Sequence, residues 1–191
     1  MDQKTKGCCC QSADKPAPNA CCTGEAAGDA NCCPPEGSAE KRLLIEFMFI
    51  DLTVCDRCLG TDASLEEAVG EVANVLKATG YEIEIRKILI ESEEQAGELG
   101  FVSSPTIRIN GQDIQLDGKE SLCESCGDVC GEDVDCRVWI WQGREYSTPP
   151  KAMLVDAILR HVYGGRQTAR PAIKQEVPDN LKRFFAAKNK K

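Results

Sequence analysis

The chain has 191 residues, with 31 acidic and 23 basic side chains and a net charge of −8. This acidic balance excludes binding to a nucleic-acid backbone as the main task, because such binding needs a basic face. The single histidine, His161, argues against His-rich zinc enzymes and histidine-based triads, and we expect it at a helix end beside Tyr163. Thirteen cysteines are the outstanding feature of the composition and point to thiol chemistry.

The sequence carries no targeting or membrane signal. No apolar run approaches the roughly 18 residues of a membrane span. The first ten residues lack the apolar segment of a secretory signal, and the closing KNKK is no lipidation motif. The expected compartment is therefore the cytoplasm, where thiols stay reduced and clustered cysteines serve as metal ligands or redox catalysts.

Composition divides the chain into three regions. Residues 1–40 contain no Val, Ile, Leu or aromatic residue, so we predict a disordered, cysteine-rich tail. Residues 41–165 are long enough to form a hydrophobic core. Residues 166–191 carry eight basic and two acidic side chains, and we predict a basic tail that is solvated or lightly docked. Its short amphipathic segment is marked by Leu181, Phe184 and Phe185.

The first half of the middle region predicts a strand, a helix and a strand. Residues 43–50 (LLIEFMFI) form an apolar run typical of a buried strand. Residues 64–79 have apolar side chains at helical spacing, and Ser64 with Glu67 forms a capping box at the start. Residues 81–86 alternate apolar and charged side chains, which predicts a second strand. This order implies a parallel pair of strands.

The second half adds a hairpin and two helices. Asn110-Gly111 is the strongest short hairpin signal in the sequence. In chain order we predict a helix over 91–99, strands over 106–109 and 113–116, a strand over 137–141 that extends the sheet, and a last helix between 148–150 and 164–165. The expected fold class is α/β, with a mixed sheet and flanking helices.

A Cys-x-x-Cys motif, Cys55 and Cys58, directly follows the first predicted strand. Together with the order of elements and the segment FVSSPTI (101–107), it resembles the thioredoxin fold family. The resemblance implies that Pro105 is cis and lies against the cysteine pair. It also implies that Cys55 is the attacking thiol and Cys58 the resolving thiol. The similarity covers about residues 41–116 and the last helix, which indicates a cysteine-rich branch and not thioredoxin proper.

The motif departs from thioredoxin in two ways. Val54 stands where thioredoxins have Trp, and the predicted helix begins near Ser64, so its dipole would act only weakly on Cys55. Between the cysteines, Arg57 would lower a thiolate pKa and Asp56 would raise it.

Residues 52–58 also look like the Thr-Cys-x-x-Cys metal loop of heavy-metal-associated domains. That fold has no need of Ser104-Pro105 before a strand, so we prefer the thioredoxin fold. Binding of a soft metal ion by the loop remains compatible with either fold.

A second set of cysteines lies in an insertion at about residues 119–136. Four thiolates this close in sequence can satisfy a tetrahedral ion such as zinc. The spacing differs from the usual zinc ribbon or finger, so redox pairs, an iron–sulfur cluster, or an arsenic or mercury site remain alternatives. The residues are Cys123, Cys126, Cys130 and Cys136.

The tail holds the third set, seven cysteines in three groups. Flexible cysteine groups can wrap a thiophilic ion, since arsenite takes three thiolates and mercuric or cuprous ions take two or three. The residues are Cys8, Cys9, Cys10, Cys21, Cys22, Cys32 and Cys33.

These sites favour a cytoplasmic protein that binds or detoxifies a soft metal or metalloid ion (arsenite, mercury or copper) on a thioredoxin-like scaffold. The alternative is a thiol–disulfide oxidoreductase or thiol-dependent reductase acting through Cys55 and Cys58. A third hypothesis is a zinc or redox sensor. We expect zinc or another thiophilic ion and no organic cofactor. The expected partners are that ion and a thiol reductant or acceptor protein, without nucleic acid or membrane.

Overall fold

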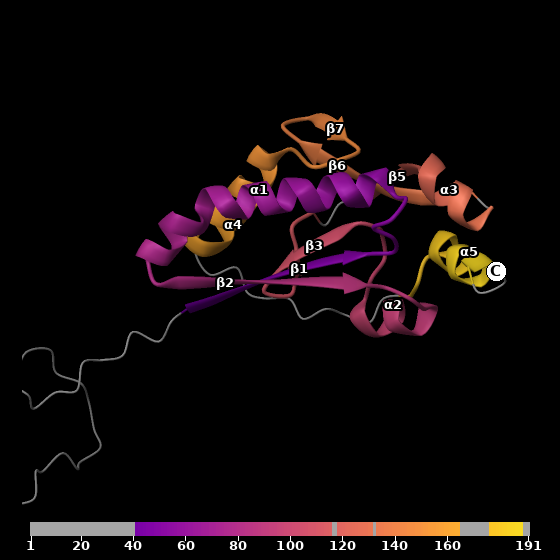
Figure 1. Cartoon of the computed structure of the whole chain (residues 1–191), viewed down its shortest axis with the longest axis horizontal. Coiled ribbons are helices and arrows are strands. Elements are labelled where there is room, and N and C mark those ends of the chain that lie inside the picture. The colour runs from indigo at the N-terminus through magenta and orange to yellow at the C-terminus, as the bar shows by residue number, and fades with distance from the viewer. Residues whose placement is uncertain (1–40, 116–117, 132, 165–175, 189–191) are drawn as a thin grey trace, which may run out of the picture. The chain divides into compact units, whose positions relative to one another are not determined.

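A four-stranded mixed sheet lies at the centre of the fold, in the order β2-β1-β3-β4 (Figure 1). The structure, a computed structural model, describes residues 41–115, 118–131, 133–164 and 176–188. β1 pairs in parallel with β2 and antiparallel with β3, and β4 pairs antiparallel with β3. Because β1 is central, side chains on both of its faces are buried, as Phe47 and Met48 show. The strands are β1 (Lys41–Phe49), β2 (Tyr81–Leu89), β3 (Thr106–Ile109) and β4 (Gln112–Asp113).

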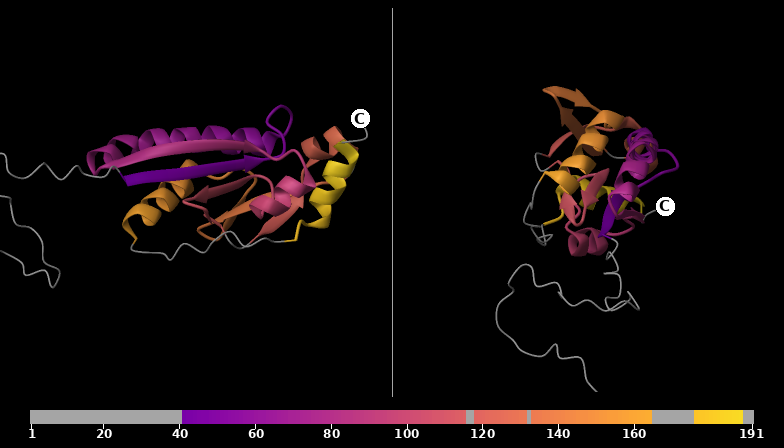
Figure 2. Two further views of the ribbon diagram at one scale, coloured as in Figure 1. Left: turned by 90° about the horizontal axis from the view of Figure 1, so that it is seen from below. Right: turned by 90° about the vertical axis from the view of Figure 1, so that its left-hand side faces the viewer.

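Three helices cover this sheet. α1 (Asp56–Ala78) and α4 (Lys151–Tyr163) pack side by side on one face, and α2 (Glu93–Leu99) lies on the other side (Figure 2). Helix α1 approaches the segment before α4 closely at Gly60, where an added Cβ would stand 2.6 Å from Thr148 Oγ1. The mixed α/β fold expected from the sequence is confirmed.

Helix α1 begins at Asp56, so the predicted start near Ser64 is wrong. Its first turn is capped by Cys55, whose sulfur accepts a hydrogen bond from the backbone N–H of Cys58 at 3.4 Å. The residues between Cys58 and Ser64, which the prediction left outside the helix, are helical because Gly60 packs against Thr148 and Thr61 is buried. Tertiary contacts therefore override the local capping signal. The dipole of α1 points at the Cys-x-x-Cys motif itself.

The Asn110-Gly111 turn is confirmed, with φ angles of 48° and 80°. The strand after it is shorter than predicted, because β4 ends at Asp113. The Asp113 carboxylate accepts a hydrogen bond from the backbone N–H of Gln115, which turns the chain away from the sheet.

A second sheet of three strands, in the order β5-β6-β7, follows the hairpin. It consists of β5 (Lys119–Leu122), β6 (Asp135–Trp141) and β7 (Arg144–Tyr146), with α3 (Glu124–Cys130) between β5 and β6. The prediction that residues 137–141 extend the main sheet is therefore wrong. The ladders of β6 run to β5 along residues 135–138 and to β7 along residues 139–141, and its Arg137 N–H donates to the Ser104 carbonyl before β3 at 2.7 Å.

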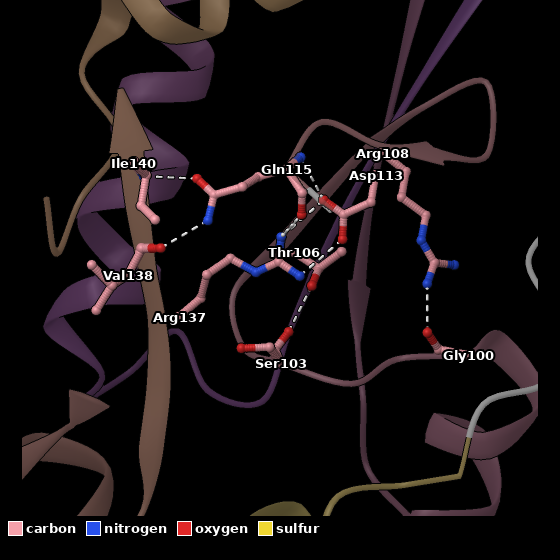
Figure 3. A network of polar contacts seen from close by, with 9 residues as sticks. All are labelled: Gly100, Ser103, Thr106, Arg108, Asp113, Gln115, Arg137, Val138 and Ile140. Atoms are coloured by element: carbon pink, nitrogen blue, oxygen red, sulfur yellow. Dashed lines mark hydrogen bonds and ion pairs between the residues drawn. The ribbon is translucent and has the colours of Figure 1, made fainter. Parts of the chain in front are cut away.

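A polar network joins β6 to the hairpin of the main sheet (Figure 3). The buried Arg137 guanidinium donates to both carboxylate oxygens of Asp113, each at 2.8 Å. The Gln115 side chain donates to the Val138 carbonyl and accepts from the Ile140 N–H. These contacts hold β6, the strand that carries Cys136, against the β3–β4 hairpin.

A further helix, α5 (Asp179–Lys188), packs against α3 and α2. Leu181 and Phe184 are fully buried and Phe185 is 2% exposed. The expectation of a solvated or lightly docked C-terminal region is therefore wrong for this segment. Its apolar side chains at positions i, i+3 and i+4 form one helix face, which joins the core.

Several expectations fall outside the described residues. The tail over 1–40 and residues 165–175 are among the undescribed parts, so the boundaries of the three predicted regions stay predictions. Among the helices that the structure describes, none combines the length and apolar character needed to cross a membrane.

Candidate metal centre

Four buried cysteine thiols converge beside the first turn of α1. The Sγ atoms of Cys55, Cys123, Cys126 and Cys136 all lie within 4.8 Å of one another. Each residue is at most 2% exposed. This group could hold a metal ion.

Three separate elements deliver these thiols. Cys55 is the N-cap of α1, and Cys123 is the N-cap of α3. Cys126 lies in the first turn of α3, three residues later, so it faces the same side as Cys123. Cys136 comes from β6, next to β5 through the pairing of Ser121 with Cys136. The backbone N–H of Cys123 donates to the Val134 carbonyl at 2.8 Å, which closes the loop around α3.

Arg57 ties the Cys-x-x-Cys turn to the strands that carry the other thiols. Its guanidinium donates to the carbonyl oxygens of Cys136 at 3.0 Å and Leu122 at 2.7 Å. It also donates to the carbonyl and the hydroxyl of Ser121, at 3.3 Å and 3.0 Å. A planar group with five donors can make all these bonds at once. Arg57 therefore fixes the distance between Cys55 and the two residues Cys123 and Cys136.

The spacing of the sulfurs suits a tetrahedral ion. Zinc–thiolate bonds of about 2.3 Å place neighbouring sulfurs of a regular tetrahedron about 3.8 Å apart. The Sγ atoms of Cys126 and Cys136 are 3.5 Å apart, and all others lie within the 4.8 Å limit. Small movements of side chains would complete the geometry. Four sulfur donors in this arrangement fit zinc or another thiophilic ion.

The thiols differ in proton affinity because they hydrogen-bond one another. Contacts with Cys123, Cys126 and Cys136 lower the pKa of Cys55 well below its usual range. Contacts with Cys126 and Cys136 lower the pKa of Cys123 to about 6. Contact with Cys123 raises the pKa values of Cys126 and Cys136 above the usual range of a cysteine thiol. Without an ion the cluster therefore holds two thiolates and two thiols near neutral pH, since four buried negative charges would repel.

Cys58 lies next to this group and is not a member of it. It is fully buried, and its Sγ is 3.5 Å from Ser104 Oγ. Contact with the Cys55 sulfur raises the pKa of Cys58 far above its usual range. The Ser104–Pro105 peptide bond is cis, and the Ser104 hydroxyl accepts from the backbone N–H of Ile50. Cys55 thus has Cys58 as a neighbour within α1, with Ser104 beyond Cys58, and the other three thiols as neighbours from α3 and β6.

The structure regroups the cysteines that the sequence had separated. It unites Cys55 of the Cys-x-x-Cys motif with Cys123, Cys126 and Cys136 of the insertion. The side chain of Cys130 and all seven tail cysteines lie outside the described residues. Spacing alone could not show that Cys55 completes the cluster, because it lies 68 residues before Cys123. The signal that came nearest was the likeness of residues 52–58 to a soft-metal loop.

Sequence reasoning also missed the role of Arg57. We expected it to act on thiolate pKa values, whereas its guanidinium donates to main-chain carbonyls and the Ser121 hydroxyl. His161 lies elsewhere, with Nε2 at 3.0 Å from the Asn110 amide nitrogen.

Comparison with known proteins gives a family and no function. A family model described as a domain of unknown function (DUF2703) matches residues 43–158. No curated protein matches the chain. No solved structure matches it either. The matched range contains Cys55, Cys58 and all four cysteines of the insertion, and ends before α5.

Proposed function

The chain belongs to the DUF2703 family, whose description states no function, and we propose that it is a thiolate metal-binding protein. Its centre would hold zinc or another thiophilic ion on Cys55, Cys123, Cys126 and Cys136. The observation that carries this proposal is the convergence of four buried thiols within 4.8 Å. A bound dication would stabilise all four as thiolates, and the thiols that are still protonated would lose their protons on binding.

The supporting contacts favour a built metal site over a chance gathering of core cysteines. Arg57 and the N–H of Cys123 hold the backbone around the sulfurs without using the sulfurs themselves. Residues that fix ligand positions in this way are typical of metal centres. Free cysteines that act only as small apolar residues need no such arrangement.

We further propose that the scaffold is thioredoxin-like. The sheet order β2-β1-β3-β4 supports this, as does the position of Cys55 and Cys58 at the start of α1. The cis Ser104–Pro105 bond beside Cys58 adds to the similarity. The second sheet and α3 would then be an addition that converts the dithiol position into a four-sulfur site.

Metal binding is favoured over oxidoreductase chemistry at the same cysteines. An attacking thiol of an oxidoreductase must reach the disulfide of a protein substrate, yet both Cys55 and Cys58 are fully buried. The Cys55 sulfur is also surrounded by three further thiols. A role in trafficking or detoxifying a soft metal or metalloid in the cytoplasm fits this chemistry. The seven tail cysteines would then supply further thiolates for capture.

The test is a metal titration of the reduced, full-length protein under anaerobic conditions. To isolate the centre, we use a tail-serine variant, the full chain with Cys8, Cys9, Cys10, Cys21, Cys22, Cys32 and Cys33 each replaced by serine. Native mass spectrometry should show one zinc ion per chain. Titration with Co²⁺ should give the visible bands of a tetrahedral tetrathiolate complex.

Matched cysteine variants identify the ligands. Cys126→Ser should lower zinc affinity by about 100-fold or more, since one of four thiolates is lost. Cys130→Ser is the control in the same helix and should leave affinity unchanged, because four sulfurs already complete the site. Equal effects of the two substitutions, or no zinc uptake by the tail-serine variant, would overturn the proposal.

A further inference from the structure

We infer that the Cys55 sulfur is shared between two exclusive states: a metal thiolate with Cys123, Cys126 and Cys136, and a disulfide with Cys58. This inference rests on the proposed metal centre and adds its regulation. Oxidation of the Cys55–Cys58 pair would expel the ion, and a bound ion would protect the pair from oxidation.

The geometry places Cys55 at the junction of the two groups. Its sulfur lies within 4.8 Å of the three other cluster sulfurs. The same sulfur accepts a hydrogen bond from the backbone N–H of Cys58, at 3.4 Å. Cys58 is a free, fully buried thiol outside the four-sulfur group. One sulfur thus has two sets of neighbours and can bond covalently to only one of them.

The two sets of cysteines around the Cys55 sulfur also belong to different secondary-structure elements. Cys55 and Cys58 both belong to the start of α1, whereas the remaining three thiols belong to α3 and β6. A disulfide within the first turn of α1 would leave only the three thiols of α3 and β6 for the ion. The ion would then no longer link α1 to these two elements. Loss of one of four thiolates lowers the affinity for a tetrahedral ion.

The chemistry balances with hydrogen peroxide as oxidant, a molecule small enough to enter a site that excludes a protein substrate. The Cys55 thiolate attacks one peroxide oxygen, the O–O bond breaks, and the departing hydroxide takes up a proton to form water. Cys58 then attacks the sulfur of the resulting sulfenic acid, which forms the S–S bond and releases water. Two electrons pass from the cysteine pair to the peroxide. The ion leaves because the Cys55 sulfur no longer carries a negative charge.

The two equilibria are coupled reciprocally. If the disulfide weakens ion binding by some factor, bound ion must stabilise the reduced pair by the same factor. A 1,000-fold loss of affinity would correspond to a midpoint potential about 90 mV more positive with zinc bound, at about 30 mV per tenfold for two electrons.

The experiment follows zinc release from the zinc-loaded tail-serine variant after addition of hydrogen peroxide. A colorimetric zinc chelator reports release, and peptide mass mapping reports disulfides. We expect release to accompany a Cys55–Cys58 disulfide, and the zinc-free protein to form that disulfide at least tenfold faster. The control is Cys58→Ser, which retains all four ligands and should release zinc at least tenfold more slowly.

The outcomes separate this inference from the proposed function. Suppose that the tail-serine variant and its Cys58→Ser derivative both take up zinc. Equal rates of zinc release, or disulfides among the other cysteines, would then overturn the shared-sulfur inference alone. If Cys58→Ser prevents folding, the mapped disulfide and the protection by zinc still decide the question in the parent variant. Failure of the reduced parent to take up zinc would overturn both.

Discussion

At the scale of single residues, the site depends on an arginine between two cysteines. Arg57 bonds to main-chain oxygens of residues that precede or belong to the ligand residues. Its contribution is therefore the position of the thiols. A lysine would keep the positive charge but lose the fork that contacts several oxygens at once.

We predict that Arg57→Lys lowers zinc affinity by about 10- to 100-fold, the usual effect of removing a group that orients a ligand. The measurement is a competition titration against a chelator of known affinity, in the tail-serine variant. The control is Arg86→Lys, at an exposed arginine that pairs with Glu84. Equal affinity of Arg57→Lys and Arg86→Lys would show that Arg57 does not position the ligands.

The proton affinities of the thiols give a second prediction at this scale. The pKa of Cys55 is lowered and that of Cys123 is about 6, so both are thiolates at pH 7.5. The pKa values of Cys126 and Cys136 are raised, so both must lose a proton when an ion binds. Zinc binding should release about two protons at pH 7.5 and about three below pH 6, where Cys123 is protonated too.

The zinc affinity of the site should rise with pH, because protons and zinc compete for the same sulfurs. Calorimetry in buffers of different ionisation enthalpy measures the number of protons released. Release of about four protons at pH 7.5 would indicate four ordinary, independent thiols. That result would contradict the hydrogen-bonded cluster.

At the scale of elements, α5 supports the metal centre from outside the region that the family model matches. It packs against α3, the helix that carries Cys126. The Asn180 amide donates to the Asp135 carbonyl, one residue before Cys136. Burial raises the pKa of Asp51, in the turn that precedes Cys55, but hydrogen bonds from Val54 and Thr53 outweigh it and lower that pKa, with a smaller contribution from the charge of Lys188. Helix α5 therefore contacts both α3 and the start of β6, the elements that carry Cys126 and Cys136.

We predict that Phe184→Ala lowers the free energy of unfolding by about 3–5 kcal/mol, since it removes a fully buried ring. It should also speed the transfer of zinc to a chelator, because α3 loses its packing partner. Arg183→Ala, at an exposed position of the same helix, is the control and should change neither quantity. Denaturant unfolding and chelator kinetics give the two readouts. Wild-type stability in Phe184→Ala would mean that α5 is not docked as described.

At the scale of the whole molecule, sequence patterns predicted elements better than their assembly. The strand over 43–50, the Asn110-Gly111 turn and the last helix are local patterns, and the structure has them. The start of α1 and the docking of α5 depend on contacts between distant residues, so local signals gave the wrong answer there. The proximity of Cys55 to Cys123, Cys126 and Cys136 likewise depends on contacts between residues far apart in the sequence. It needs β6 to be held at the β3–β4 hairpin by Arg137 and Asp113, a pair 24 residues apart in sequence.

Removal of the metal ion should affect the second sheet and α3 differently from the main sheet. The bound ion would join the start of α1 to α3 and β6, in addition to the contacts of Arg57 and the Arg137–Asp113 pair. An ion at 1,000 times its dissociation constant adds about 4 kcal/mol of stability to the state that binds it. Its removal should therefore loosen the second sheet and α3 first, since the main sheet has its own core of β1, α1 and α4.

Hydrogen–deuterium exchange with and without zinc, in the tail-serine variant, measures this difference along the chain. We expect amides of residues 119–130 and 135–146 to exchange at least tenfold faster without zinc. Amides of β1 and of β3, which pair with each other in the main sheet, should change little and serve as the internal control. Uniform acceleration across both sheets would mean that the molecule opens as one cooperative unit. In that case the ion would stabilise the entire fold and not the attachment of the second sheet alone.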